Sequence, residues 1–219
     1  MKVAEESEPD DVQKRGKPTD LTRYPHFVQG VIAQFLYVGA QVGTWSYYIQ
    51  YIEDYTHQPE KTAGYFLTGT LVAFGVGRFT ATYLMKFVKP ARLMGIYGVI
   101  NLVLVGIGIL RPGWGGVGAL FMTSFFMSLM FPTIFALGIK ELGPNTKLGG
   151  SIIIIMSIIG GAVATPVMGL LFPFTHSLAL AMTEPLVCYT FITARCDYPN
   201  FRNQKTSGLG HLPVFMNKQ

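Results

Sequence analysis

The chain has 219 residues, of which 50% are hydrophobic and only 13% are charged, and its mean hydropathy is positive. A soluble domain carries about twice that charged fraction, so the composition excludes a typical soluble enzyme and predicts an integral membrane protein. The pI of about 9.2 does not indicate nucleic-acid binding, because the lysines and arginines fall at the ends of apolar segments. The histidines and cysteines lack metal-ligand spacing, so we expect no metal and no other cofactor.

Residues 1–25 are hydrophilic, with acidic side chains followed by basic ones. They contain too few apolar residues to bury a core, so we expect an unstructured cytoplasmic leader or linker. The polar residues 195–219 are expected to form a cytoplasmic tail. Residues 26–194 remain as a predicted membrane domain.

Six apolar segments in that domain predict membrane-spanning helices, each of which needs roughly 20 residues. They are expected at 27–52, 63–87, 92–110, 115–139, 149–172 and 177–194. Pro132 and Pro166 predict interior breaks in the fourth and fifth segments, and Glu184-Pro185 interrupts the sixth. Two groups of three spans predict an all-α membrane fold with an inverted 3+3 repeat, which is typical of secondary transporters.

The positive charges predict the orientation of these six spans. If both termini and the loops 86–92 and 140–147 share one side, that side holds all but three of the 17 lysines and arginines. The exceptions are Lys61 and Arg111 on the other side and Arg78 inside the second span. The positive-inside rule then predicts a multi-pass protein of the plasma (cytoplasmic) membrane with both termini cytoplasmic. Arg78 is either an interfacial anchor or part of a structural motif.

Polar and aromatic side chains recur at three- and four-residue steps along the first span and share one helical face: Gln34, Tyr37, Gln41, Trp45 and Tyr48. Unpaired amides are costly in lipid, so this stripe should face protein or water. Either it bonds to neighbouring helices or it lines a polar cavity. Gly39 and Gly43, on the other side of the helix, should let another helix approach closely.

Five blocks of the sequence resemble the fucose permease branch of the major facilitator superfamily, in order and in spacing. They are 37–47 (YVGAQVGTWSY), 65–70 (YFLTGT), 77–80 (GRFT), 131–140 (FPTIFALGIK) and 158–169 (IIGGAVATPVMG). The resemblance is to the C-terminal six-helix half of that family. It implies one half of a major facilitator fold and a partial chain that lacks the first half.

Members of this family are sugar–proton symporters that work by alternating access, with the sugar bound between the two halves. The resemblance implies that the first, second, fourth and fifth spans face the cavity. The side chains that it implies as cavity lining are Gln34, Tyr37, Gln41, Trp45, Tyr48, Thr68 and Phe131. Amides bond to sugar hydroxyls, and aromatic rings cover the apolar face of a sugar ring.

The chain departs from the family at two places. Phe131 stands where the family has a tyrosine, which favours a related hexose or an amino sugar over fucose. Glu184 stands where the family is apolar, and we interpret it as degeneration of the sequence rather than as a functional carboxylate. The proton-coupling carboxylates of the family lie in the first half. We therefore expect that this chain needs an N-terminal six-helix half, or a homodimer, to transport sugar and protons.

The leading prediction is a sugar transporter in the lipid bilayer, with a small-molecule sugar and protons as its partners. The alternative is a non-transporting membrane interaction protein, a truncated remnant that pairs with a full-length transporter. A membrane enzyme is poorly supported, because no catalytic dyad, metal cluster or phosphate loop can be assembled from the sequence.

Overall fold

The computed structural model describes residues 21–175 and 177–196, so the greater part of the predicted leader and tail lies outside the described residues. The described part of the chain is helical. Its elements are α2 (Pro25–Thr56), α3 (Glu60–Leu84), α4 (Pro90–Leu110), α5 (Trp114–Met127), α6 (Met130–Ile139), the 3-10 turn η1 (Gly143–Asn145), α7 (Thr146–Thr175), α8 (Leu178–Ala181) and α9 (Thr183–Cys196).

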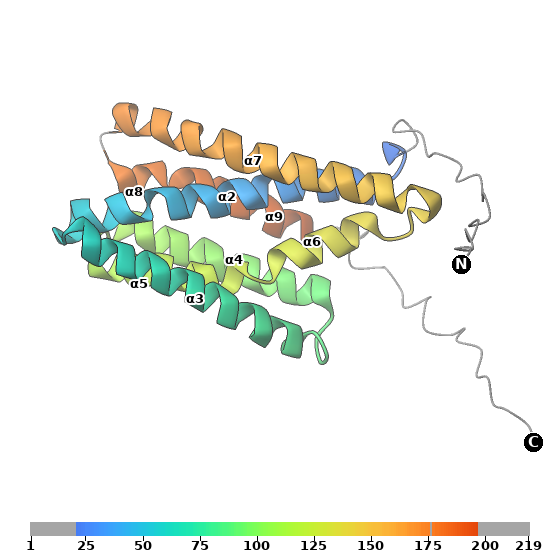
Figure 1. Ribbon diagram of the computed structural model, residues 1–219, viewed down its shortest axis with the longest axis horizontal. Helices are drawn as coiled ribbons and strands as arrows, with labels where there is room; N and C mark the ends of the chain where they lie inside the picture. The colour runs from blue at the N-terminus through green and yellow to red at the C-terminus, as the bar shows by residue number, and fades with distance from the viewer. Residues whose placement is uncertain (1–20, 176, 197–219) are drawn as a thin grey trace, which may run out of the picture.

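The helices form one elongated bundle organised around α2 (Figure 1). Helix α2 packs along α7 and also contacts α3, α5, α6 and α9, while α4 packs against α5 and α9. The α5–α6 pair forms the predicted fourth span, and the α8–α9 pair forms the sixth. The start of α2 and the end of α9 lie at the same end of the bundle, as an even number of crossings requires. The predicted all-α arrangement of six spans is confirmed.

The six spans differ in their apolar character. Three segments are long and apolar enough to cross a membrane: Pro90–Leu110, Trp114–Ile139 and Gly143–Leu171. Helices α2 and α3 have 32 and 25 residues and are therefore also long enough. They are less apolar, because α2 carries the glutamine and tyrosine stripe and both helices carry charged residues near their shared connection. The sixth span, Leu178–Ala194, is a shorter apolar segment.

The interior prolines have different effects on their helices. The break predicted at Pro132 is confirmed, because α5 ends at Met127 and α6 begins at Met130. The break predicted at Pro166 is wrong, because α7 continues through it. A proline removes a single backbone donor, and membrane helices tolerate this loss where a neighbouring helix supports them. Helix α7 has such support from α2 along its length.

Glycines set the closest approaches between helices. A Cβ atom added at Gly30 of α2 would lie 2.8 Å from the Gly138 Cα of α6. A Cβ atom at Gly39 would lie 3.2 Å from the Ala164 Cβ, and one at Gly43 would lie 2.7 Å from the Met168 Sδ, both in α7. The prediction that Gly39 and Gly43 admit another helix is confirmed, and that helix is α7.

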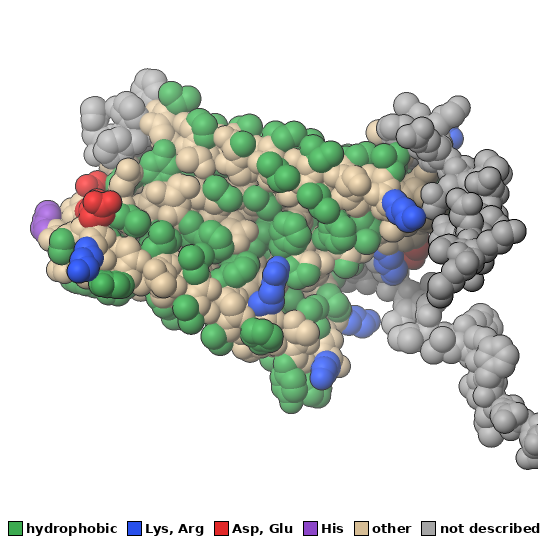
Figure 2. All heavy atoms as spheres, viewed as in Figure 1, with side chains coloured by type: hydrophobic (Ala, Val, Ile, Leu, Met, Phe, Trp, Pro, Cys, Tyr) green, Lys and Arg blue, Asp and Glu red, His purple; other side chains and the backbone are tan. Residues whose placement is uncertain are grey.

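Apolar side chains are spread over the whole length of the face shown in Figure 2, and most basic side chains lie toward one end, whereas the opposite end carries acidic side chains together with one basic side chain and a histidine. Large hydrophobic side chains are exposed along α3, α4 and α7, including Phe79, Leu110 and Ile158. Soluble monomers rarely expose continuous apolar surfaces of this kind. The distribution fits a bundle surrounded by lipid, with its connections in water.

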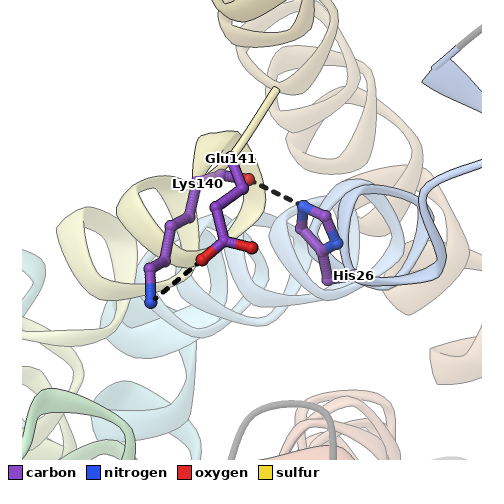
Figure 3. A network of polar contacts seen from close by, with 3 residues as sticks. All are labelled: His26, Lys140 and Glu141. Atoms are coloured by element: carbon purple, nitrogen blue, oxygen red, sulfur yellow. Dashed lines mark hydrogen bonds and ion pairs between the residues drawn. The ribbon is translucent and has the colours of Figure 1, made fainter. Parts of the chain in front are cut away.

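The basic end of the bundle is closed by contacts between α2 and the chain after α6. The His26 Nε2 donates a hydrogen bond to the Lys140 carbonyl over 2.8 Å, and the Lys140 ammonium lies 3.6 Å from a carboxylate oxygen of Glu141 (Figure 3). A small apolar cluster that includes Phe27 and Leu142 packs at the same end. These contacts attach the predicted polar loop 140–147 to the start of α2.

Candidate functional site

Three members of the predicted stripe lie wholly inside the bundle. Gln34, Tyr37 and Tyr48 are at most 1% exposed. The Tyr37 hydroxyl donates to the Met127 carbonyl over 2.8 Å, and the Tyr48 hydroxyl donates to the Val117 carbonyl over 3.0 Å. Both tyrosines therefore bond to α5. Bonding to a neighbouring helix is one of the two roles that the sequence left open for the stripe, the other being the lining of a polar cavity.

The bond from Tyr37 has a local cause in the break of the fourth span. Met127 is the last residue of α5, so its carbonyl is one of those that a helix end leaves without an intrahelical partner. Tyr37 supplies that partner from α2. The Phe131 ring follows the break and meets the Tyr37 ring edge-on, with centroids 6.4 Å apart. The predicted residues Tyr37 and Phe131 are thus brought together.

Trp45 lies where α2, α3 and α5 meet, and it is half-buried. Its indole N–H donates to the Ser124 hydroxyl over 3.1 Å, and its ring meets Phe74 of α3 edge-on at 5.3 Å between centroids. The Arg78 guanidinium lies 5.5 Å from the centre of the same Phe74 ring. The Trp45 ring, the Phe74 ring and the Arg78 guanidinium therefore form a row that runs from α2 to the exposed side of α3.

The remaining predicted residues have fewer contacts. Gln41 is 8% exposed. Thr68 is exposed on α3, and its hydroxyl donates to the Gly64 carbonyl of its own helix over 3.0 Å. The lining of a sugar cavity by all seven residues stays a prediction, because the family places that cavity against a second six-helix half.

Two amide side chains are buried without hydrogen-bond partners among the described residues. Both amide atoms of Gln34 and both of Asn101 are in this position. A buried unsatisfied amide costs about 1–3 kcal/mol, and such groups are commonly satisfied by bound water. Asn101 is the strongly polar residue in the middle of α4, and its sequence position favours a bond between helices. The structure records no such bond for it.

Glu184, interpreted from the sequence as degeneration, is the second residue of α9. One of its carboxyl oxygens, Oε2, is buried and has no partner among the described residues. The other, Oε1, accepts a hydrogen bond from the Cys188 thiol over 3.3 Å. The carboxyl group lies against Gly39 and Gly43. The glycine pair that predicted a helix contact is therefore also what leaves room for a carboxyl group.

No family model matches the chain. Among curated proteins, it is 43% identical over 189 residues to the L-fucose-proton symporter of Escherichia coli K12, covering 84% of this chain and 41% of that protein. The solved structure of the major facilitator superfamily transporter FucP in the outward conformation matches with a TM-score of 0.78 and 41% identity. That match covers 81% of this chain and 43% of the solved chain.

The chain belongs to the fucose permease branch of the major facilitator superfamily. It is also 29% identical over 176 residues to the glucose/galactose transporter of Brucella abortus, covering 78% of this chain and 41% of that protein. The chain spans less than half the length of these curated relatives and matches their C-terminal half. The six spans, which include the central α2, are thus one half of a fucose permease fold, and the protein is a multi-pass membrane protein.

Proposed function

We propose that this chain forms the C-terminal half of a sugar–proton symporter whose substrate is a hexose or an amino sugar. The observation that carries the proposal is its 43% identity, over 84% of its residues, to an L-fucose-proton symporter. A relative named for glucose and galactose transport supports a broader hexose class. The proposed activity is transport by alternating access rather than enzymatic catalysis.

The chemistry of the proposed sugar site comes from four members of the predicted set, of which Gln41 is 8% exposed and the others are half-buried or exposed. Trp45 and Phe131 are half-buried, and Gln41 and Thr68 offer an amide and a hydroxyl. An aromatic ring packs on the apolar face of a sugar, and amides donate to and accept from its hydroxyls. The buried tyrosines Tyr37 and Tyr48 bond α2 to α5, and Gln41 and Trp45 share that face of α2.

The proposed partner is an N-terminal six-helix half, supplied by a second polypeptide or mimicked by a second copy of this chain. The proposed orientation has both termini in the cytoplasm. The basic residues Arg23, Lys86, Arg92, Lys140 and Lys147 belong to connections at the end of the bundle that holds the start of α2. The positive-inside rule assigns that end to the cytoplasm.

Sugar binding can be measured through Trp45, because the only other tryptophan is Trp114. A Trp114→Phe chain is reconstituted with a separately expressed N-terminal half of the E. coli relative and titrated with fucose, galactose, glucose and N-acetylglucosamine. We expect a saturable fluorescence change with at least one sugar, absent when Trp45→Phe is added. Identical titrations with and without Trp45 would contradict the site. Stable association of the halves without a sugar response would favour the non-transporting interaction protein.

A further inference from the structure

Glu184 is placed inside the bundle at the level of the middle of α2. A Cβ atom added at Gly43 would lie 3.4 Å from its Oε2, and one added at Gly39 would lie 3.8 Å from its Oε1. The opposing residues of α7 at this level are Ala164 and Met168, which are apolar. The Oε2 atom of the carboxyl group is therefore buried against glycine backbone and apolar side chains, whereas the Glu184 residue as a whole is half-buried.

The surroundings of Glu184 provide no positive charge among the described residues. The ion pair recorded among the described residues joins Lys140 and Glu141 at the basic end of the bundle, and Glu184 takes part in none. Its hydrogen-bond donor is the thiol of Cys188, a neutral group one turn along α9. The neighbouring helices α4 and α7 each carry one basic residue, Arg92 and Lys147. Both residues are exposed and lie near the ends of their helices.

The other titratable groups near Glu184 are also neutral in their ordinary state. Tyr189 of α9 lies within electrostatic range of both Glu184 and Tyr37. The Tyr37 hydroxyl of α2 already donates to a carbonyl of α5, and the Tyr97 ring of α4 faces Phe126. Helix α8 consists of Leu178–Ala181, which contain no titratable group.

A carboxylate in such surroundings is costly, because its buried Oε2 loses hydration and no charged group pairs with it among the described residues. The Cys188 thiol and the first turn of α9 offset only part of that cost. A protonated carboxyl group carries no charge and keeps one acceptor oxygen for the Cys188 thiol. We propose that Glu184 is a proton-binding site of this half, held as a neutral acid while α9 is packed against Gly39 and Gly43.

The proton of this site is exchanged with water. Protonation forms the O–H bond on the carboxyl group and removes the charge, and deprotonation returns the proton to water and leaves a carboxylate beside the α2 backbone. That carboxylate needs water or a cation, so its formation is linked to separation of α9 from α2. A role of this linkage in transport rests on the proposed function, whereas the proton site itself can be measured without transport.

The test is an infrared pH titration of the full chain in lipid nanodiscs, following the carbonyl band of protonated carboxyl groups. We expect a band that persists at neutral pH in the wild-type chain and is lost in Glu184→Gln. The matched control is Glu141→Gln, which removes an exposed carboxylate and should leave the band unchanged. Absence of the band at neutral pH, or its persistence in a folded Glu184→Gln chain, would overturn the proposal.

A second variant keeps the test decisive if Glu184→Gln does not fold. Cys188→Ala leaves the carboxyl group in place and removes its thiol donor, so the band should shift to higher wavenumber. An unshifted band would overturn the assignment to Glu184. Uptake of sugar is measured separately, in proteoliposomes that also contain an N-terminal half. A band without uptake by the assembled pair leaves the proton site standing and contradicts the transporter, whereas uptake without the band contradicts the proton site alone.

Discussion

Tyr37 of α2 donates its hydroxyl hydrogen to the Met127 carbonyl at the end of α5, over 2.8 Å. This bond joins the central helix to the point where the fourth span breaks before Pro132. The broken helix leaves a carbonyl without its usual partner, and the stripe on α2 supplies one. The same stripe that the sequence associates with sugar binding therefore also holds the bundle together.

Replacing Tyr37 tests this structural role. Tyr37→Phe leaves the Met127 carbonyl buried without a donor, which should lower the free energy of unfolding by about 1–3 kcal/mol. The measurement is unfolding in mixed micelles of a mild and a denaturing detergent. Tyr65→Phe is the matched control, because Tyr65 is 67% exposed and should be nearly neutral. Equal effects at both positions would show that the bond to Met127 contributes nothing.

Gly30 tests the contact between α2 and α6. In Gly30→Ala, the new methyl group would lie 2.8 Å from the Gly138 Cα, so the backbone of α6 must move away. We expect a loss of about 1–3 kcal/mol in the free energy of unfolding. In Gly64→Ala the methyl group meets no atom within 4 Å, and alanine favours the helix, so stability should be unchanged or slightly higher. A stable Gly30→Ala chain would refute the close approach.

Gln34 tests the cost of a buried amide. Gln34→Leu replaces two unsatisfied polar atoms by an apolar group of similar size. Such a replacement is close to neutral or stabilising, so the free energy of unfolding should stay the same or rise by about 1 kcal/mol. The same micelle titration measures it. A clear loss of stability would mean that the amide makes hydrogen bonds in the membrane, to water or to a partner half.

Cysteine labelling tests the orientation. Single cysteines are introduced by Lys61→Cys, at the start of α3, and by Lys147→Cys, at the start of α7, after the native cysteines are replaced. In intact cells, a membrane-impermeant thiol reagent should label position 61 and not position 147, because the positive-inside rule makes the second position cytoplasmic. The opposite pattern would reverse the proposed topology.

The sequence was sufficient for the spans, because apolar length and the flanking charges are local properties. The sequence was less informative about which neighbouring helix each helical face packs against. Helical spacing placed Tyr37 and Tyr48 on one face, but their partners lie on α5, far along the chain. The break at Pro132 followed the local rule. That at Pro166 did not, because packing of α7 on α2 compensates for one missing hydrogen bond.

The position of Glu184 could not be inferred from its neighbours in the sequence. An isolated acid before a proline looks like an interruption of a span, and α9 does begin there. Its enclosure depends on Gly39 and Gly43, which lie on another helix far earlier in the chain. The role of Trp45 and Phe131 in sugar binding likewise does not follow from local sequence, because the proposed cavity needs a second wall from a partner half.

The most direct measurement is uptake by proteoliposomes that contain this chain together with the N-terminal half of the E. coli relative, under an imposed proton gradient. The account predicts gradient-dependent uptake of a radiolabelled hexose or amino sugar by the pair and none by either half alone. Trp114→Phe should leave this uptake intact. Trp45→Ala should reduce it. Uptake by this chain alone would contradict the need for a separate N-terminal half and would require a second copy of this chain as the partner. Absence of uptake by a stably assembled pair would contradict the assignment to sugar transport.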